Sequence, residues 1–222
     1  MDQKKFSDSL EIADIGFANG KAEGYPFSDT EKQKMINEAA EAYGKFLDAL
    51  KCDWRNDPNS ADTPRRVAKA YMEKWAGRYE LAPSITAFPA DGYSGLVQES
   101  NIPVTSMCSH HHETVSGLVS IAYIPGEQGK VIGLSKLNRI VEYFGRRGAI
   151  QEQLTVAIHT AVDRICEYNQ GVAVMINATH NCVSCRGVKH SGASMQTTKL
   201  SGCFLDEDSA RAEFYKNIDL AK

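Results

Sequence analysis

The sequence predicts an α+β protein in which a helical N-terminal region precedes a portion that mixes helices with strands. Three observations lead to this class: two N-terminal stretches place apolar residues at helical spacing, prolines and glycines crowd residues 83–95, and strand and helix patterns alternate after them. At 222 residues the chain is long enough for one large domain, or for one domain with a helical extension. We therefore expect a flexible N-terminal arm at residues 1–27, a helical region at 28–82 and the main domain at 83–222.

The helical region follows an arm that lacks a regular pattern. Residues 1–27 are polar and interrupted by glycine and proline, so we expect loose order there. Ser28 or Asp29 can cap a helix over about residues 30–50, in which apolar side chains recur at helical spacing. Asp62-Thr63-Pro64 combines a capping residue with a proline at the first helical position, and it predicts the start of a second helix.

The main domain is predicted to interleave strands and helices. Residues 117–125 alternate their side chains between two faces of a strand, and residues 171–178 form an apolar run typical of a buried strand. Ser135 can cap a helix that carries an apolar face. We expect strands at 117–125, 171–178 and 197–204, and helices beginning at Ser135 and spanning 150–168 and 209–218.

The main chemical signal is a cluster of histidines and cysteines in two distant segments. Cys108 is followed, after one serine, by three consecutive histidines, and His180 stands two residues before Cys182. Thiolate and imidazole are the ligands that Zn²⁺ prefers. Cys108 and His111 are three residues apart, so both can reach one ion only where the chain turns or bulges. The pattern predicts a zinc site formed by Cys108, His111 and Cys182.

The spacing leaves three interpretations of this cluster open. A catalytic zinc keeps about three protein ligands and an open position for water. Cys185 forms a C-x-x-C pair with Cys182, so the three predicted ligands and Cys185 could equally make a closed Cys3His structural site; a cluster without metal is the third interpretation. His110 and His180 lie beside predicted ligands without being needed as ligands. Imidazoles near a metal-bound water are natural proton carriers, which favours catalysis.

Cations gather at two of the predicted helix starts. Arg66 and Lys69 lie in the first turns of the second helix, and Lys136 and Arg139 share one side of the helix that Ser135 caps. Two cations at the positive end of a helix are unfavourable alone, but together with free backbone N–H groups they suit a phosphate. A solvated charged face is the alternative interpretation for the first pair.

Composition and the N-terminus argue against two classes of protein. A net charge of -3 and a pI near 6.1 are unlike the basic surplus of general nucleic-acid binders. The first residues are polar, and the apolar runs are shorter than the roughly 18 residues that a membrane span requires. We therefore expect a cytoplasmic protein without a signal peptide, a membrane span or a nucleic-acid partner.

Several further motifs accompany the cluster over about residues 63–204. They are Cys108-x-His110-His111, Tyr123-Ile124-Pro125, Ile132-Gly133-Leu134-Ser135-Lys136-Leu137-Asn138-Arg139-Ile140-Val141, Gln151-Glu152-x-Leu154-Thr155, and His180-x-Cys182 with Arg186-Gly187. In order and spacing they resemble the GTP cyclohydrolase I family. This resemblance implies a T-fold (tunnelling fold), an antiparallel sheet backed by helices, in subunits that form pentamers and then a decamer with active sites at subunit interfaces.

The resemblance also implies a reaction and a role for each matched residue. GTP would be hydrolysed at C8, formate would leave, and rearrangement would give 7,8-dihydroneopterin triphosphate, the first step towards folate, a pterin cofactor or a deazaguanine. The implied zinc ligands are Cys108, His111 and Cys182, and His110 and His180 would carry protons. Gln151 and Glu152 would hold the guanine edge. The triphosphate would contact Ser135, Lys136, Arg139 and Arg186, and we count Ser135 as catalytic. Arg66 and Lys69 would reach the triphosphate from another subunit.

The chain departs from the family pattern at a few positions and leaves two other functions open. The departures, Ser109, His112, Glu113, Cys185 and His190, are expected to retune the metal site and the phosphate contacts. One alternative is a non-catalytic T-fold that binds a purine or pterin around a structural Cys3His zinc. The other is a T-fold enzyme that acts on a pterin or deazapurine.

Overall fold

The structure, a computed structural model, describes residues 9, 11–16 and 20–221 of the chain. Its strands are β1 (Ala87–Pro89), β2 (Val97–Met107), β3 (Thr114–Pro125), β4 (Lys130–Ile132), β5 (Asn169–His180) and β6 (Met195–Leu200). Its longer helices are α2 (Asp29–Ala49), α3 (Thr63–Lys74), α4 (Leu134–Gly145), α5 (Gln151–Ile165) and α8 (Asp208–Leu220). Short helical turns are η1 (Ala76–Arg78), α6 (Asn181–Ser184) and α7 (Cys203–Asp206).

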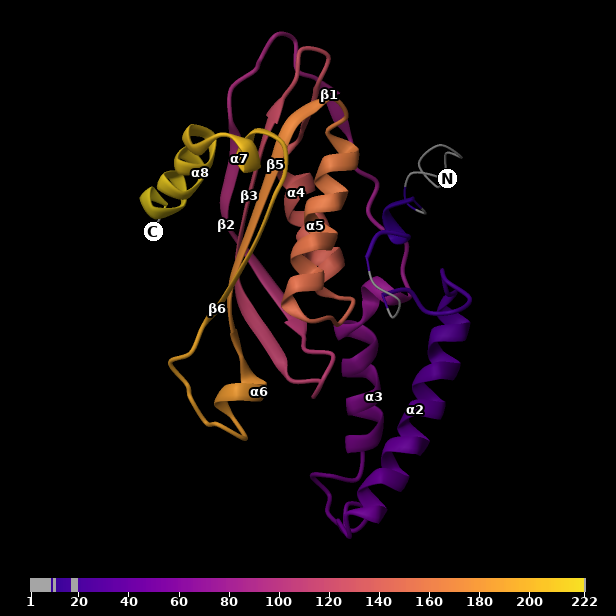
Figure 1. The fold of residues 1–222 in the computed structure, drawn as a ribbon. Helices are drawn as coiled ribbons and strands as arrows, with labels where there is room; N and C mark the ends of the chain where they lie inside the picture. The colour runs from indigo at the N-terminus through magenta and orange to yellow at the C-terminus, as the bar shows by residue number, and fades with distance from the viewer. Residues whose placement is uncertain (1–8, 10, 17–19, 222) are drawn as a thin grey trace.

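A four-stranded antiparallel sheet in the order β2-β3-β5-β6 forms the body of the protein (Figure 1). Helices α4 and α5 lie against one face of this sheet, and α7 with α8 packs against one end of the other face. Strands β1 and β4 pair in a separate small sheet. Helices α2 and α3 lie side by side and extend away from the sheet (Figure 1). The expected α+β class, an antiparallel sheet backed by helices, is confirmed.

The predicted start of the first helix is confirmed in detail. Ser28 caps α2. Its backbone N–H donates to the carboxylate of Glu31 at 2.8 Å, and the backbone N–H of Glu31 donates to the hydroxyl of Ser28 at 3.3 Å. This reciprocal pair satisfies two donors that a helix start leaves without partners. The second helix begins at Thr63 with Pro64 in its first turn, as the motif indicates.

Two expectations about the elements that lead into the site were wrong. The structure contains an eleven-residue strand, β2, that the pattern did not predict. Asn101 has a φ of 61° beside a bulge, which breaks the alternation of faces, and Pro103 lies within the strand, where it is tolerated because β2 is at the sheet edge. Helix α4 is capped at Gly133 rather than at Ser135, which lies in its first turn.

The last predicted strand also ends earlier than expected. Strand β6 spans Met195–Leu200 rather than 197–204, because Gly202 adopts a φ of 52° and the chain then turns into α7. Its shorter course leaves Phe204 free to pack under α8 against Phe214, with ring centroids 6.0 Å apart. A small second core therefore forms on the face of the sheet opposite α4 and α5.

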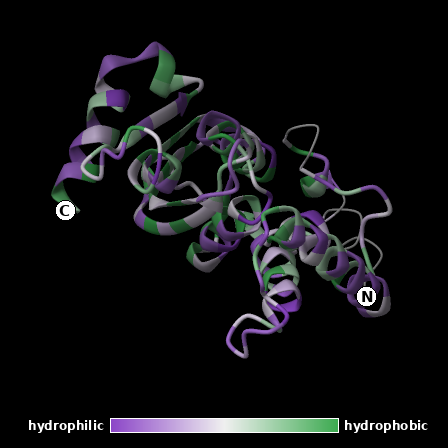
Figure 2. Ribbon diagram, turned by 90° about the horizontal axis from the view of Figure 1, so that it is seen from below, coloured by the Kyte–Doolittle hydropathy of each residue, from purple (hydrophilic) through white to green (hydrophobic). Residues whose placement is uncertain are grey.

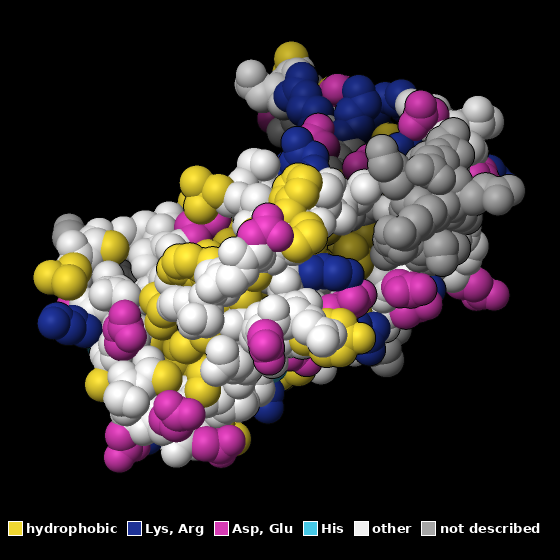
Figure 3. Space-filling model, turned by 90° about the horizontal axis from the view of Figure 1, so that it is seen from above, with side chains coloured by type: hydrophobic (Ala, Val, Ile, Leu, Met, Phe, Trp, Pro, Cys, Tyr) yellow, Lys and Arg dark blue, Asp and Glu magenta, His cyan; other side chains and the backbone are white. Residues whose placement is uncertain are grey.

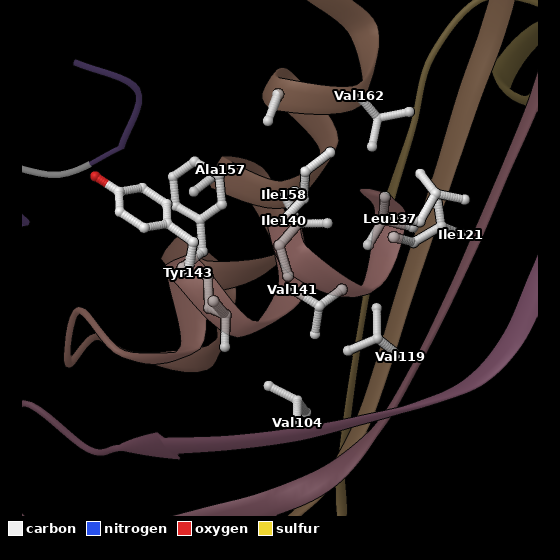
Figure 4. Packing of buried hydrophobic residues seen from close by; sticks show 14 of the residues in the cluster. Val104, Val119, Ile121, Leu137, Ile140, Val141, Tyr143, Ala157, Ile158 and Val162 are labelled. Atoms are coloured by element: carbon white, nitrogen blue, oxygen red, sulfur yellow. The ribbon is translucent and has the colours of Figure 1, made fainter. Parts of the chain in front are cut away.

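The main core lies between the sheet and the pair α4 and α5. Figure 4 shows Val119 and Ile121 of β3 facing Leu137 and Val141 of α4, with Ile158 of α5 beside them. The helices carry both hydrophobic and hydrophilic bands, as Figure 2 shows. Burying the apolar band of each helix against the sheet fixes where both helices begin, and these two beginnings carry most of the predicted substrate residues.

Part of the segment expected to be a loose arm packs against this core. Ile12, Ala13 and Ile15 are buried in it. Other residues of the arm, at 1–8, 10 and 17–19, lie outside the described part of the chain. The division into an arm, a helical region and a catalytic domain stays a proposal. Among the described helices, none is long and apolar enough to cross a membrane.

Truncating the main core should destabilise the protein far more than truncating the open face of the same strand. Ile121 is completely buried between the sheet and α4, so Ile121→Ala should lower the free energy of unfolding by about 2–5 kcal/mol. Leu118 is 47% exposed on the opposite face of β3, and Leu118→Ala should change it by about 0.5 kcal/mol or less. Urea unfolding at one protein concentration compares the two, and equal losses would contradict the assignment of the core.

Candidate active site

The first segment of the site is the turn that joins β2 to β3. The backbone N–H of Cys108 donates to the carbonyl of Glu113, and that of His112 donates to the carbonyl of Cys108, both at 2.9 Å. His112 has a φ of 57°, a left-handed conformation in which histidine is enriched relative to most residues. The sequence predicts that Cys108 and His111 can share an ion only if the chain turns between them, and the chain does turn here.

The second segment follows the end of β5, and strand pairing brings it to the turn. Val115, near the start of β3, lies opposite His180, the last residue of β5, and α6 begins at the following residue, Asn181. The sulfurs of Cys108 and Cys182 and a ring nitrogen of His180 consequently lie within 4.8 Å of one another. Segments about seventy residues apart in sequence therefore form one group of potential ligands. The two cysteines predicted to share an ion are brought together.

The histidine in this group is not the one that the spacing suggested. His180 contributes the imidazole, whereas His111 is exposed and stands outside the group that the described residues form. His110 lies beside the group, with its Nδ1 3.9 Å from the sulfur of Cys108. Cys185, the possible fourth ligand of a closed site, is also exposed and outside the group. The role of His111 as a ligand stays a prediction.

The third consecutive histidine links the turn to helix α3. The ring of His112 meets Tyr71 and Trp75 edge-on, with centroid distances of 5.8 and 5.0 Å. Such perpendicular contacts between aromatic rings are favourable. Sequence reasoning noted His112 only as a departure from the family pattern and missed both aromatic partners. Tyr71 lies in α3 and Trp75, the residue that caps the end of this helix, follows four residues later, a spacing that could have indicated a shared face.

Gln151 holds His180 in place from the first position of α5. The side-chain amide nitrogen of Gln151 donates to the carbonyls of Ile176 at 3.2 Å and Met195 at 2.9 Å, and to the hydroxyl of Thr197 at 3.1 Å. Its oxygen lies 2.7 Å from Nε2 of His180, so that ring nitrogen carries the proton and donates it. Gln151 is only 2% exposed. It orients an imidazole in this chain, a role that sequence reasoning missed.

Burial and neighbouring groups shift the pKa values of Cys182 and His180. Burial raises the pKa of the Cys182 thiol, the neighbouring Cys108 raises it further, and Arg186 opposes them. Burial lowers the pKa of His180, against the pull of the Glu152 carboxylate. Two sulfurs and an imidazole in close contact are a donor set that zinc binds well, and a bound cation deprotonates coordinating thiols. The residues present therefore fit a zinc ion.

The predicted substrate residues lie on several separate elements. Glu152 is exposed in the first turn of α5, one residue after Gln151. Ser135 and Arg139 are exposed near the start of α4, where the Nζ of Lys136 donates to the carbonyl of Ser84 at 3.3 Å. Arg186 follows α6, and its charge acts to lower the pKa of the Cys182 thiol. Arg66 and Lys69 are exposed on α3, and Arg66 pairs with Asp62 at 3.4 Å.

The cysteines, His180 and the start of α5 lie at one end of the sheet, whereas the start of α4 lies beside the beginning of β2, where Asn138 donates to Glu99 at 2.6 Å. The turn 108–113, the start of α5 and α6 all lie towards the lower end of the sheet in Figure 1. The opposite end, seen in Figure 3, displays hydrophobic, basic and acidic side chains, and the histidines that the structure describes are not in view there. Within one chain, the potential metal ligands and the start of α5 therefore share one region, and the predicted phosphate residues of α4 lie apart from it.

Comparison with known proteins agrees with the motifs on which this site rests. Residues 39–219 match the model of the family described as GTP cyclohydrolase I. GTP cyclohydrolase 1 of Shewanella sp. (strain ANA-3) is 43% identical over 162 residues, which cover 72% of this chain and 74% of that protein. GTP cyclohydrolase 1 of Vibrio vulnificus (strain YJ016) is 39% identical over 195 residues, or 86% and 87% of the two chains.

Among solved structures, an archaeosine synthase QueF-like protein in the apo form overlaps 48% of this chain and 93% of its own, with a TM-score of 0.39 and 20% identity. The match to the family model is far broader, since it includes both cysteines, His180 and the beginnings of α4 and α5. The chain belongs to the GTP cyclohydrolase I family.

Proposed function

We propose that this protein is a zinc-dependent GTP cyclohydrolase I, which hydrolyses GTP at C8, releases formate and forms 7,8-dihydroneopterin triphosphate. The observation that carries the proposal is that the sulfurs of Cys108 and Cys182 lie within 4.8 Å of one another and of a ring nitrogen of His180, which supports two thiolate ligands with an imidazole beside them. This group stands next to the start of α5, in a chain that belongs to this family. The proposed metal ligands and the proposed guanine-binding residues therefore lie in one region.

Cys108 and Cys182 would hold the zinc through their sulfurs. We propose His111 as the third ligand, because it shares the turn 108–113 with Cys108 and its exposed side chain has room to reorient. A zinc ion held there would supply Lewis-acid chemistry, which can lower the pKa of water to about 7 and so provide a nucleophile at neutral pH. Cys185 is exposed and stands outside the group of described ligands, which supports an open site over a closed one.

His180 and His110 are proposed to carry protons. The side-chain oxygen of Gln151 accepts a hydrogen bond from Nε2–H of His180 at 2.7 Å, so Nδ1 of His180 is the atom available to take or deliver a proton. The amide of Gln151 is itself fixed by β5 and β6, and this fixes the ring. Protonation of N7 of the purine by a nearby imidazolium would make C8 more electrophilic. His110, beside Cys108, is placed for the same kind of work.

Glu152 is proposed to select guanine. An ionised carboxylate offers two acceptor oxygens, which match the N1–H and amino donors on one edge of guanine. Adenine lacks this pair of donors, so a site built around Glu152 would leave the carboxylate without partners when adenine enters. The family resemblance implies that Gln151 also binds the guanine edge. In this chain we propose that Gln151 acts mainly by holding His180.

The triphosphate is proposed to lie along the start of α4 and to need more than one subunit. Ser135, Lys136 and Arg139 occupy the first turns of that twelve-residue helix, where free N–H groups also favour anions. Arg186 would join from beyond α6. Because Arg66 and Lys69 lie exposed on α3, we propose that they serve the site of a neighbouring copy in a pentamer or decamer.

The cell compartment and the pathway are further proposals. The six cysteines, all within the described residues, are free, which is usual in a reducing compartment, and we propose a cytoplasmic enzyme. Its product would enter folate, pterin cofactor or deazaguanine synthesis. A non-catalytic purine or pterin binder and an enzyme for another pterin or deazapurine substrate are the competing functions, and formate release distinguishes both from this proposal.

The purified protein loaded with zinc should release one formate for each GTP consumed. Removing zinc with a chelator should abolish formate release, and adding zinc back should restore it, because the nucleophile depends on the metal. ATP serves as the matched control and should give no formate. GTP binding without formate would favour the non-catalytic binder, and turnover of a pterin without GTP loss would favour the other enzyme.

Cys182→Ser should abolish tight zinc binding, whereas Cys185→Ser should retain it. A serine hydroxyl is a much poorer zinc ligand than a thiolate, and Cys185 is exposed outside the group. Competition with a coloured chelator measures the zinc dissociation constant of each folded variant. Equal loss in both variants would instead support the closed Cys3His site.

His111→Ala and His180→Ala should separate the ligand from the proton carrier. If His111 is the third ligand, His111→Ala should weaken zinc binding by about 10-fold or more, because each ligand matters strongly to affinity. His180→Ala should keep zinc and lose formate release by roughly 100-fold or more, as expected for a lost general acid or base. The reverse pattern in chelator competition would assign His180 as the ligand and contradict the proposal for His111.

A further inference from the structure

A buried arginine joins the N-terminal segment to the loop that precedes α5. Arg147 lies between α4 and α5 and is only 2% exposed. Its guanidinium donates to the carbonyls of Ala13 at 3.2 Å and Ile15 at 2.6 Å, and also to that of Gly20. We call residues 11–16 with Gly20 the N-terminal strap. The strap thus receives several hydrogen bonds from one side chain of the core.

The guanidinium depends on the strap for much of its hydrogen bonding. Its carbon lies 5.6 Å from the ring centroid of Tyr143 and 5.5 Å from that of Phe144, so aromatic rings line its other side. Burial lowers the pKa of Arg147. A buried cation is costly unless its donors are satisfied, and carbonyl oxygens of the strap satisfy them here. Docking of the strap and burial of Arg147 therefore stabilise each other.

The loop that holds Arg147 also touches the elements of the active site. The backbone N–H of Ala149 donates to the carbonyl of Met107 at 3.1 Å, directly before Cys108. A Cβ on Gly148 would lie 2.6 Å from the indole nitrogen of Trp75, which shows how closely α3 approaches. Gln151 begins α5 two residues after Ala149. A shift of residues 146–150 would therefore move the first turn of α5.

The strap also forms one wall of a cavity that reaches Glu152. Asp14, Ile15 and Gly16 line a cavity of about 560 Å³ together with the outer face of α5, including Glu152 and Gln153. Glu152 is the residue proposed above to bind the guanine edge. The position of the strap consequently affects the space next to that carboxylate as well as the loop behind it.

We propose that Arg147 is a positioning residue for GTP binding, which docks the N-terminal strap onto the 146–150 loop and so fixes Glu152 and the cavity wall beside it. The proposal rests on the function proposed above for Glu152. It assigns the strap a part in substrate affinity, and it leaves the chemical step to the metal group and His180. Loss of docking should therefore raise KM for GTP and change kcat little.

Two variants disturb the contact from opposite sides. Arg147→Met removes the guanidinium but keeps an apolar stem over Tyr143 and Phe144. Gly20→Ala leaves the core sequence unchanged and adds one methyl group on the strap side of the contact. A Cβ there would lie 2.4 Å from the guanidinium of Arg147. Arg146→Met is the matched control, because Arg146 is exposed in the same loop and pairs with Glu142 at 3.2 Å.

Hydrogen exchange and steady-state kinetics on the zinc-loaded full-length protein test the proposal. Arg147→Met and Gly20→Ala should each speed amide exchange in residues 11–16 and raise KM for GTP by about 10-fold, with kcat within about twofold. The control should match the wild type in both measurements. Adding Gly20→Ala to Arg147→Met should have little further effect, because the colliding group is already gone.

The possible failures are distinct. Unchanged amide exchange in both variants would overturn the proposal. Faster exchange in residues 11–16 with an unchanged KM would also overturn it, and so would a fall in kcat at constant KM. Should Arg147→Met fail to fold, Gly20→Ala decides alone. Failure of the function proposed for the enzyme would appear differently, as a wild-type protein that releases no formate from GTP while its strap stays protected from exchange.

Discussion

The antiparallel pairing of β3 with β5 is the constraint on which the site depends. It sets Val115 opposite His180, and it thereby brings the turn 108–113 to the start of α6. The apolar face of β3 is buried under α4 and α5, so a slip of one residue would expose Val119 and Ile121 to solvent. The register that gathers the sulfurs is thus specified by burial of the core, far from the sulfurs themselves.

Helix packing supplies the second half of the site. Because α4 and α5 must cover the sheet, their first turns are carried to defined places, and the start of α5 is tied to the end of β2 through Ala149 and Met107. Gln151 shows the consequence. Its amide is satisfied by β5, β6 and His180, so a buried polar group becomes a rigid support for the imidazole of His180.

The N-terminal segment illustrates the limit of composition as a guide. Residues 1–27 are polar and irregular, which favours loose order, yet Ile12 and Ile15 are buried and Arg147 donates to the strap's carbonyls. A backbone carbonyl offers an acceptor whatever its side chain, so the pattern of side chains carries no signal of this contact. The same reasoning applies to β2. Asn101 and Pro103 interrupt the strand pattern in the sequence, but pairing with β3 at the sheet edge stabilises the strand.

The sequence by itself determined which residue types could do the chemistry and in which family to seek it. Cysteines 108 and 182, the histidines around them and the cations at helix starts are local patterns that need no fold to be recognised. Only the tertiary structure decided which of them meet: His180 rather than His111 beside the sulfurs, Gln151 behind His180, and Arg147 under the strap. Those contacts join residues that are far apart in the sequence. They are fixed by strand register, by core packing and by the need to satisfy buried polar groups, and the spacing of neighbouring residues does not reveal any of these.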